Sequence, residues 1–121
     1  SLPDLSYEKL EHELLGLEKE FYEKFQVGFK YMRPPAGEYS ERVLAAAQQL
    51  GYKTIFWSFA YDDWHTDKIR GADYAYDKVM ENLHNGAVFL LHAVSKDNAD
   101  ALDRIIKDIR AEGYEIKAFD L

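Results

Sequence analysis

The chain has 121 residues, and its composition of 47% hydrophobic, 15% aromatic and 31% charged residues suits one globular domain or part of one. A net charge of −7 argues against nucleic-acid binding and against attachment to an anionic membrane surface. The sequence contains no cysteine, which excludes disulfides and thiolate chemistry, and it contains no apolar run as long as a transmembrane helix.

The first half of the chain combines two helical patterns with one extended pattern. Residues 6–25 are predicted to form a helix with Ser6 as its N-cap, because apolar residues recur there at three- and four-residue spacing. This apolar row comprises Leu10, Leu14, Leu17, Phe21 and Phe25. Residues 29–32 are predicted to form a strand. A second helix is predicted from Ser40 through Leu50, with Gly51 as its stop.

The second half alternates strands and helices. The continuous apolar run at residues 53–59 predicts a strand that is covered on both faces. After it we expect a helix over residues 72–83, a strand over residues 87–91, a last helix that begins at Ser95 or Asp97 and ends at Gly113, and a final strand over residues 114–119. The last helix is expected to turn Leu102, Ile105, Ile106 and Ile109 inward. This order predicts an α/β fold of parallel strands with covering helices.

Polar residues follow three of the predicted strands. In parallel α/β folds, functional side chains gather at the carboxyl ends of the strands. These ends are Arg33–Gly37, Ala60–His65 and His92–Ser95. Position alone supports a site made of Arg33, Asp63 and His92, in which Asp63 would orient the His92 imidazole for acid–base chemistry. It does not name a reaction.

Each candidate also has a purely structural interpretation. Arg33 could be satisfied by a neighbouring carboxylate or by carbonyl groups, and His92 could be a core histidine. The loop that carries Asp62, His65 and Asp67 could bind a cation, although acidic loops are more often only solvated.

Three short motifs together are more specific than any one of them. RPPAG (Arg33–Gly37), YDDW (Tyr61–Trp64) and FLLH (Phe89–His92) resemble the last three of five motifs of the NodB-type polysaccharide deacetylases, carbohydrate esterase family four. The stretch over residues 84–114 is similar to the subgroup of peptidoglycan deacetylases that prepare muramic δ-lactam in the spore cortex. The resemblance covers essentially the whole chain.

The resemblance implies an irregular (β/α) barrel, of which this chain would be the C-terminal part. The family's first two motifs carry an Asp-Asp pair and an H-x-x-x-H pair, which supply the catalytic base and an Asp-His-His metal site; neither motif is present here. Residues 1–121 are therefore expected to be the C-terminal segment of one catalytic domain. The rest of that domain would be their partner, and zinc or another divalent cation would be held outside this chain.

Roles for three residues follow from the resemblance. Arg33 would be buried against the aspartate base of the missing part and tune it. His92 would be the general acid that protonates the leaving amine. Asp63 would orient His92 and favour its charged form. Amide hydrolysis needs such an acid because an amine is a poor leaving group, and positioned acids typically contribute about 10²–10⁴ in rate.

Three further residues would contact the substrate. The backbone N–H near Ala36 would hold the oxyanion, and Trp64 and Leu90 would line a pocket for the acetyl methyl group. Without the resemblance, Trp64 on its polar loop could equally pack on a partner, on a sugar face or over the core. The resemblance therefore implies a metal-dependent peptidoglycan N-deacetylase, located outside the cytoplasm or on the cell or spore surface, of which this chain alone would be inactive.

Three alternatives remain open from the sequence. The chain could be a non-catalytic glycan-binding or structural module derived from the same fold. It could be a different enzyme with its own metal site at Asp62, His65 and Asp67. It could also be a nicked or truncated product that has lost its partner half. A partial barrel has open strand edges, which favours self-association.

Overall fold

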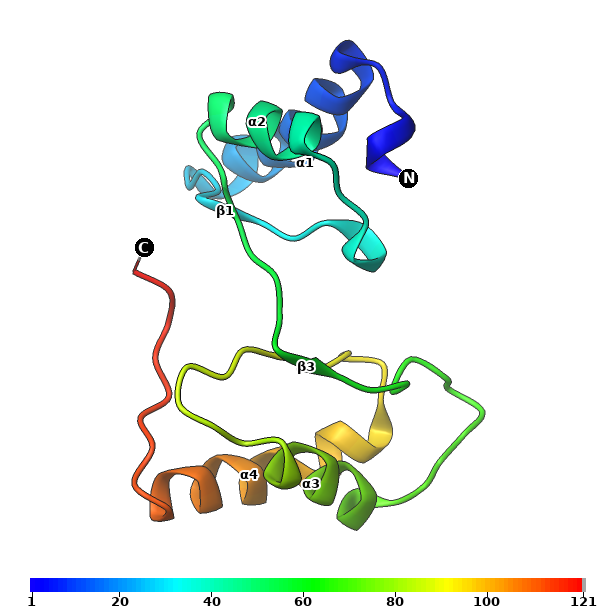
Figure 1. Ribbon diagram of the computed structural model, residues 1–121, viewed down its shortest axis with the longest axis vertical. Coiled ribbons are helices and arrows are strands. Elements are labelled where there is room, and N and C mark those ends of the chain that lie inside the picture. Colours follow the sequence, from blue (N-terminus) through cyan, green and yellow to red (C-terminus); the bar gives the residue numbers. More distant parts are fainter. Residues whose placement is uncertain (121) are drawn as a thin grey trace. The chain divides into compact units, whose positions relative to one another are not determined.

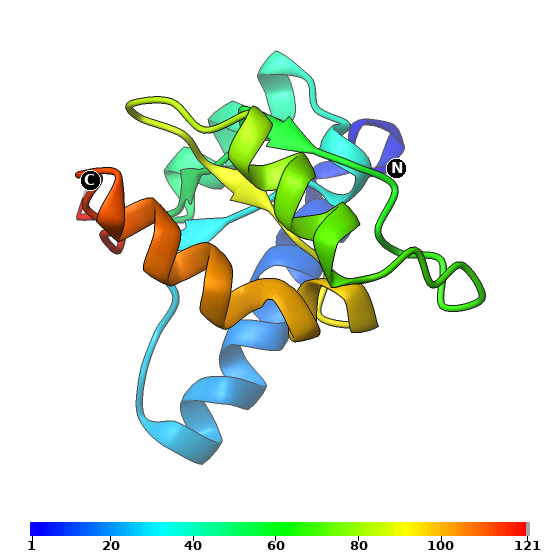
Figure 2. The same ribbon diagram turned by 90° about the horizontal axis from the view of Figure 1, so that it is seen from below.

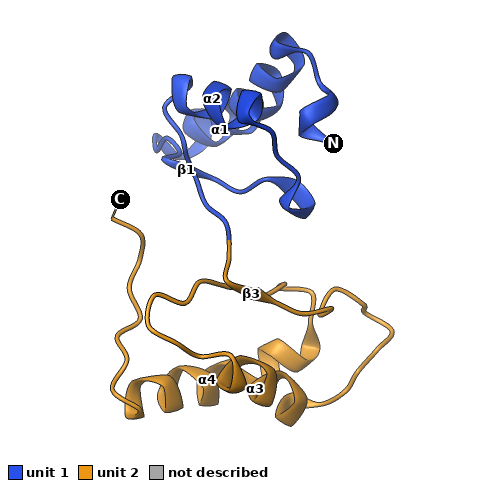
Figure 3. Ribbon diagram, in the orientation of Figure 1, with its two compact units in different colours: residues 1–56, 121 blue, residues 57–120 orange. Residues whose placement is uncertain are grey.

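The computed structural model describes residues 1–120, which form two compact units, residues 1–56 and residues 57–120 (Figure 3). Unit 1 contains, in chain order, η1 (Leu2–Asp4), α1 (Tyr7–Phe25), β1 (Tyr31–Met32), η2 (Pro35–Gly37), α2 (Glu41–Gln49) and β2 (Lys53–Thr54) (Figure 1). Unit 2 contains β3 (Phe59–Ala60), α3 (Ala72–Glu81), β4 (Phe89–Leu90) and α4 (Lys96–Ala111).

The helices of unit 1 begin where their capping residues predict. Ser6 Oγ accepts a hydrogen bond from Lys9 N (3.3 Å), and Ser40 Oγ accepts one from Val43 N (3.2 Å), so each serine satisfies one backbone donor of the first turn. The helix after Ser40 ends before Gly51, whose φ of +90° is a conformation that favours glycine. Both predicted helices of this unit are confirmed.

The core of unit 1 lies between α1 and α2. Leu10, Val43 and Ala46 are buried there. Leu17 and Phe25, predicted on the same apolar row as Leu10, are instead 65% and 60% exposed. The reason is length: α2 has nine residues and α1 has nineteen, so the shorter helix covers only part of the longer one. Periodicity in the sequence identifies the apolar face of a helix, but not how much of that face another element covers.

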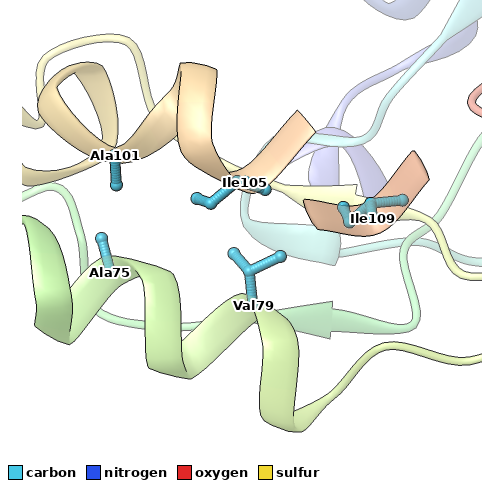
Figure 4. Packing of buried hydrophobic residues seen from close by; sticks show 5 residues of the cluster. All are labelled: Ala75, Val79, Ala101, Ile105 and Ile109. Carbon is cyan, nitrogen blue, oxygen red and sulfur yellow. The ribbon is translucent and has the colours of Figure 1, made fainter. Parts of the chain in front are cut away.

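The core of unit 2 lies between α3 and α4, which lie side by side along one face of the β3–β4 pair (Figures 1 and 2). Ala75 and Val79 on α3 point toward Ala101, Ile105 and Ile109 on α4 (Figure 4). The α4 residues recur every four positions, which places them on one stripe. Leu102, predicted to face inward, is 46% exposed because it is displaced by one position from that stripe.

Both strand pairs are parallel, as predicted. β1 pairs with β2 in unit 1, and β3 pairs with β4 in unit 2. The continuous strand predicted over residues 53–59 is wrong, because the chain changes its hydrogen-bond partner within that run. Ile55 N donates to Met32 O (2.8 Å), whereas Ser58 N donates to Val88 O (2.9 Å). Apolar composition does not reveal such a change of partner.

The final strand predicted over residues 114–119 is also wrong. Tyr114 N donates to Ile109 O (3.3 Å), which closes the end of α4, and the described chain after it has no regular structure. Ile116 and Phe119 are 49% and 44% exposed, and none of the four described strands pairs with this segment. None of the helices in residues 1–120 combines the length and the apolarity needed to cross a membrane.

Candidate active site

The two strands of unit 2 deliver polar residues to the same edge. The parallel register places Phe59 beside Phe89 and Ala60 beside Leu90. The residues that follow these pairs therefore leave the strands at the same end. Asp63 follows β3 and His92 follows β4, and their side chains are in direct contact.

Asp63 is a buried carboxylate held by three hydrogen bonds. Its side chain is fully shielded from solvent. Oδ1 lies 2.6 Å from His92 Nδ1, and Oδ2 accepts from His92 N and from Asn98 Nδ2, each at 2.6 Å. A buried charge must be compensated by donors or by an opposite charge, and these three donors supply that compensation.

One ring nitrogen of His92 can exchange a proton with its surroundings. Nδ1 faces an acceptor-only carboxylate oxygen, so Nδ1 carries the proton and Nε2 is the nitrogen that can bind or release one. The His92 side chain is 32% exposed, so the ring is not sealed from its surroundings. The Trp64 ring packs against it at a steep interplanar angle of 71°, with the ring centroids 5.8 Å apart, and Trp64 itself is 52% exposed.

Asn98 is a member of this cluster that the sequence prediction missed. It is 6% exposed, and its Nδ2 donates to Asp63 Oδ2 and to His92 O (3.3 Å). Its Oδ1 accepts from the Tyr61 hydroxyl, and its backbone N–H donates to Ser95 Oγ, the N-cap of α4. A usable signal was present, because the first turn of a helix after a parallel strand lies at the strand's carboxyl end.

Arg70 organises the acidic loop after β3. Its guanidinium donates to Asp62 Oδ1 (2.9 Å) and to Asp62 O (2.8 Å), and it lies 4.3 Å from the Tyr74 ring centroid. This hydrogen bond from Arg70 holds the pKa of Asp62 below its usual value. The Asp97 carboxylate accepts from Arg70 N (3.0 Å) and Gly71 N (2.9 Å), so it ties the end of the loop to α4.

The residues of this loop do not form a cation site. Among residues 1–120 no three histidine or acidic side chains are arranged to hold a metal ion. Asp62 is instead paired with Arg70, and the His65 ring packs 5.4 Å from the Trp64 ring. The alternative of a metal site at Asp62, His65 and Asp67 therefore has no geometric support in the described chain.

Two predicted site residues, Arg33 and Ala36, belong to unit 1. Pro34 is fully buried, and Gly37 N donates to Pro34 O (3.0 Å) in a tight turn. Ala36 has a φ of +54°, which L-residues with a Cβ rarely adopt. Arg33 is exposed in the described chain. Its expected burial was against an aspartate outside residues 1–121, so that role stays a prediction.

The remaining four predicted residues belong to unit 2. Asp63, Trp64 and His92 form the contacts described above, and Leu90 is the last residue of β4 and is half-buried. The two predicted site residues of unit 1 and the four of unit 2 are therefore described separately. The predicted roles of all six residues stay predictions.

Comparison with known proteins identifies relatives of the chain. A family model described as polysaccharide deacetylase matches residues 1–55. The chain is 49% identical over 90 residues to the peptidoglycan-N-acetylmuramic acid deacetylase PdaA of Bacillus subtilis. That match covers 74% of this chain and 34% of the deacetylase, so the chain spans about a third of its relative.

Solved structures give the same result for the fold. The structure of Bacillus subtilis PdaA, a family 4 carbohydrate esterase, matches 96% of this chain and 50% of its own, with a TM-score of 0.91 and 41% identity. A carbohydrate esterase family 4 pseudoenzyme from Bacillus anthracis matches 93% of this chain and 38% of its own, with a TM-score of 0.83 and 25% identity. The predicted fold class, part of an irregular (β/α) barrel, is thereby confirmed.

Proposed function

The chain belongs to the NodB-type polysaccharide deacetylases of carbohydrate esterase family four, in the peptidoglycan subgroup, and from this we propose that the whole protein is a metal-dependent peptidoglycan N-deacetylase. Its substrates are N-acetylated amino sugars of the cell wall. Muramic acid residues are favoured, because the relative named above is a deacetylase of N-acetylmuramic acid. The observation that carries the proposal is the contact of buried Asp63 with half-exposed His92 at a strand end.

The reaction requires a proton for the leaving nitrogen. Water adds to the acetamide carbonyl carbon, the carbon–nitrogen bond breaks, and acetate and a free amine leave. His92 donates the proton from Nε2 to the amine nitrogen as that bond breaks, and the Asp63 carboxylate on Nδ1 stabilises the imidazolium beforehand. The histidine must therefore enter the cycle protonated.

The deacetylases of this family are generally metal-dependent. A divalent cation, when bound, supplies an activated water and a polarised carbonyl in such enzymes. The described residues contain no set of ligands that fits one, so its ligands are proposed to lie outside residues 1–121. Zinc is the favoured metal. The isolated chain is accordingly proposed to be inactive.

Four other residues complete the proposed site. Arg33 tunes the catalytic base, and the N–H near Ala36 holds the oxyanion. Trp64 and Leu90 enclose the acetyl methyl group, which excludes larger acyl groups. The 52% exposed side chain of Trp64 is available for contact with a ligand, and the left-handed backbone of Ala36 is the kind of strained conformation that clusters at functional sites, so both support these roles.

Replacing the proposed general acid tests the function. In the intact protein His92→Ala should lower the rate of acetate release from N-acetylated peptidoglycan by about 10²–10⁴, the usual contribution of a positioned acid. His84→Ala is the matched control: it removes an exposed imidazole of the same unit, bonded to Ser58, and should leave the rate unchanged. Full activity of His92→Ala would reject the proposal.

A non-catalytic glycan-binding module is the second candidate. A pseudoenzyme among the structural neighbours shows that this fold occurs without activity. The exposed Trp64 ring would suit a sugar face. The intact Asp63–His92 contact argues for catalysis, because a binding module does not need a buried carboxylate behind an imidazole. Glycan binding by the intact protein without acetate release would favour this candidate.

Location and partners are part of the same proposal. A peptidoglycan substrate places the protein at the cell wall, outside the cytoplasm or on the spore surface. The rest of the deacetylase domain is proposed as the partner of residues 1–121. Each described sheet has only two strands, so open edges also support self-association of the isolated chain. Sedimentation as a monomer at all concentrations would contradict that last point.

A further inference from the structure

The side chain of Asn98 joins the ends of both strands of unit 2. Its amide bonds to Tyr61 and Asp63, which follow β3, and to the carbonyl of His92, which follows β4. Because it is 6% exposed, it can act only through its neighbours. We propose that Asn98, held in orientation by Tyr61, is a positioning residue that sets the rotation of the Asp63 carboxylate and so directs it at His92.

The argument starts with the two oxygens of Asp63. Oδ2 receives two donors, His92 N and Asn98 Nδ2, each at 2.6 Å. Oδ1 is thereby turned to His92 Nδ1, also at 2.6 Å. The torsion that rotates a carboxylate is broad and has little preference of its own, so its angle is set by hydrogen bonds. Without Asn98, only one backbone donor would hold Oδ2.

The orientation of the amide is set by Tyr61. An inverted amide would turn its oxygen toward the Asp63 carboxylate, and two acceptors would face each other. The Tyr61 hydroxyl donates to Asn98 Oδ1 and so distinguishes the two ends of the amide. Burial, followed by the charge of Asp63, raises the pKa of Tyr61, so its hydroxyl remains a donor wherever the enzyme would work.

The backbone of Asn98 is equally well held. It is the third residue of α4, and its N–H donates to the N-cap Ser95 (3.1 Å). A side chain on the first turn of a capped sixteen-residue helix is a more precise support than one on a loop. The chain of contacts from Tyr61 through Asn98 to Asp63 therefore ends on a fixed frame.

The kinetic consequence of this inference rests on the proposed deacetylase function. In the intact protein Asn98→Ala should lower kcat about tenfold to a hundredfold, because a misdirected acid loses much of its effect, and should leave KM within twofold. Tyr61→Phe keeps the ring and should lower kcat less, by severalfold. Asn82→Ala is the matched control, since that amide donates to Lys78 O at the far end of α3, and its kcat should be unchanged.

A spectroscopic measurement separates this inference from the function. NMR spectra that correlate ring nitrogens with ring protons, on protein with isotope-labelled histidine, report which nitrogen of His92 is protonated. His92→Gln assigns the signals. In spectra recorded at a pH where the His92 ring is neutral, the unaltered protein and Asn82→Ala should show the single ring proton on Nδ1, and Asn98→Ala and Tyr61→Phe should show a mixture of both tautomers.

The outcomes are decisive in each case. Altered His92 signals in Asn98→Ala support the inference even if the intact protein proves to have no deacetylase activity. Wild-type His92 signals in both variants overturn it, whatever happens to the rate. An active enzyme whose kcat is unchanged in Asn98→Ala also overturns it. If Asn98→Ala does not fold, Tyr61→Phe alone decides by the same criteria.

Discussion

The two compact units support their strand ends by different means. Among residues 1–120, tyrosines aside, the four buried polar residues all lie in unit 2, around the ends of β3 and β4: Asp63, Ser95, Asp97 and Asn98. In unit 1 the turn after β1 is shaped by its backbone. Pro34 and Pro35 restrict φ, and Ala36 and Gly37 adopt positive φ values of 54° and 71°.

The difference teaches which changes each unit will tolerate. A buried hydrogen-bond network depends on every donor and acceptor, so removing one group leaves others without partners. A turn held by its backbone depends on φ and ψ, so it tolerates changes of side chain that keep those angles. Unit 2 should therefore respond to polar substitutions and unit 1 to conformational ones.

The largest effect is expected from Asp63, which tests the network directly. Asp63→Ala removes the acceptor of three donors in a buried site and should lower the free energy of unfolding by about 3–5 kcal/mol. Its neighbour Asp62 is the matched control. That side chain is 42% exposed with one ionic partner, Arg70, so Asp62→Ala should cost much less. Urea unfolding of the intact protein measures both.

Equal losses for Asp62→Ala and Asp63→Ala would contradict the comparison. They would mean that the three donors around Asp63 find water as easily as Arg70 does. A loss at Asp63 alone, together with a wild-type unfolding slope, would show that the native state and not the unfolded chain carries the effect.

The second effect compares one tyrosine from each unit at high pH. The pKa of Tyr52 is raised, first by burial and then by Glu18, which its hydroxyl contacts; the pKa of Tyr61 is raised, first by burial and then by Asp63. Above about pH 10 an unfolded tyrosine ionises while the folded one stays neutral. The stability from each group is thus complete below pH 10 and is lost as pH rises beyond it.

Phenylalanine at either position should remove part of this alkaline dependence. The slope that one group can contribute is at most about 1.4 kcal/mol per pH unit. Tyr52→Phe should flatten the curve more than Tyr61→Phe, because the shift at Tyr52 is the larger and solvent screens Tyr61. Urea unfolding between about pH 9 and pH 11, on either side of the ordinary tyrosine pKa of about 10, measures the slope of stability against pH. An unchanged slope in both variants would show that neither hydroxyl is protected.

The helices could be predicted from local chemistry, and β1 and β4 lie within predicted strands, but the pairing of the run at residues 53–59 could not be predicted. Ser6, Ser40 and Ser95 cap their helices as their sequence neighbourhoods indicate, since capping is a contact between residues three apart. A strand needs a partner that is distant in sequence. The run at residues 53–59 pairs first with residues near Met32 and then with Val88, which no local pattern encodes.

The same distinction applies to the candidate site. Asp63 and His92 could be named because each directly follows a strand and the motifs around them resemble a known family. The place of Asn98 in the first turn after β4 could be read from the sequence, but its hydrogen bonds could not, because its partners are 35 and 37 residues away along the chain. Arg70 was missed for a similar reason, since its pairing with Asp62 depends on how the loop folds back.

The smallest effect is expected at Ala36, and it tests the backbone side of the comparison. A residue with a Cβ in the left-handed region strains the folded chain by roughly 1–2 kcal/mol. Glycine relieves that strain, but it also raises the conformational entropy of the unfolded chain, which lowers the stability by about 0.4–1 kcal/mol. Ala36→Gly should therefore raise the free energy of unfolding by roughly 0.5–1 kcal/mol. Ala45→Gly, the same change on an exposed position inside α2, should lower it by about 1 kcal/mol.

Opposite signs for the two variants would show that the turn stores strain at Ala36, which a site that presents a backbone N–H to a substrate would retain. Equal destabilisation would show that the turn gains nothing from glycine, and the contrast between the units would then rest on unit 2 alone.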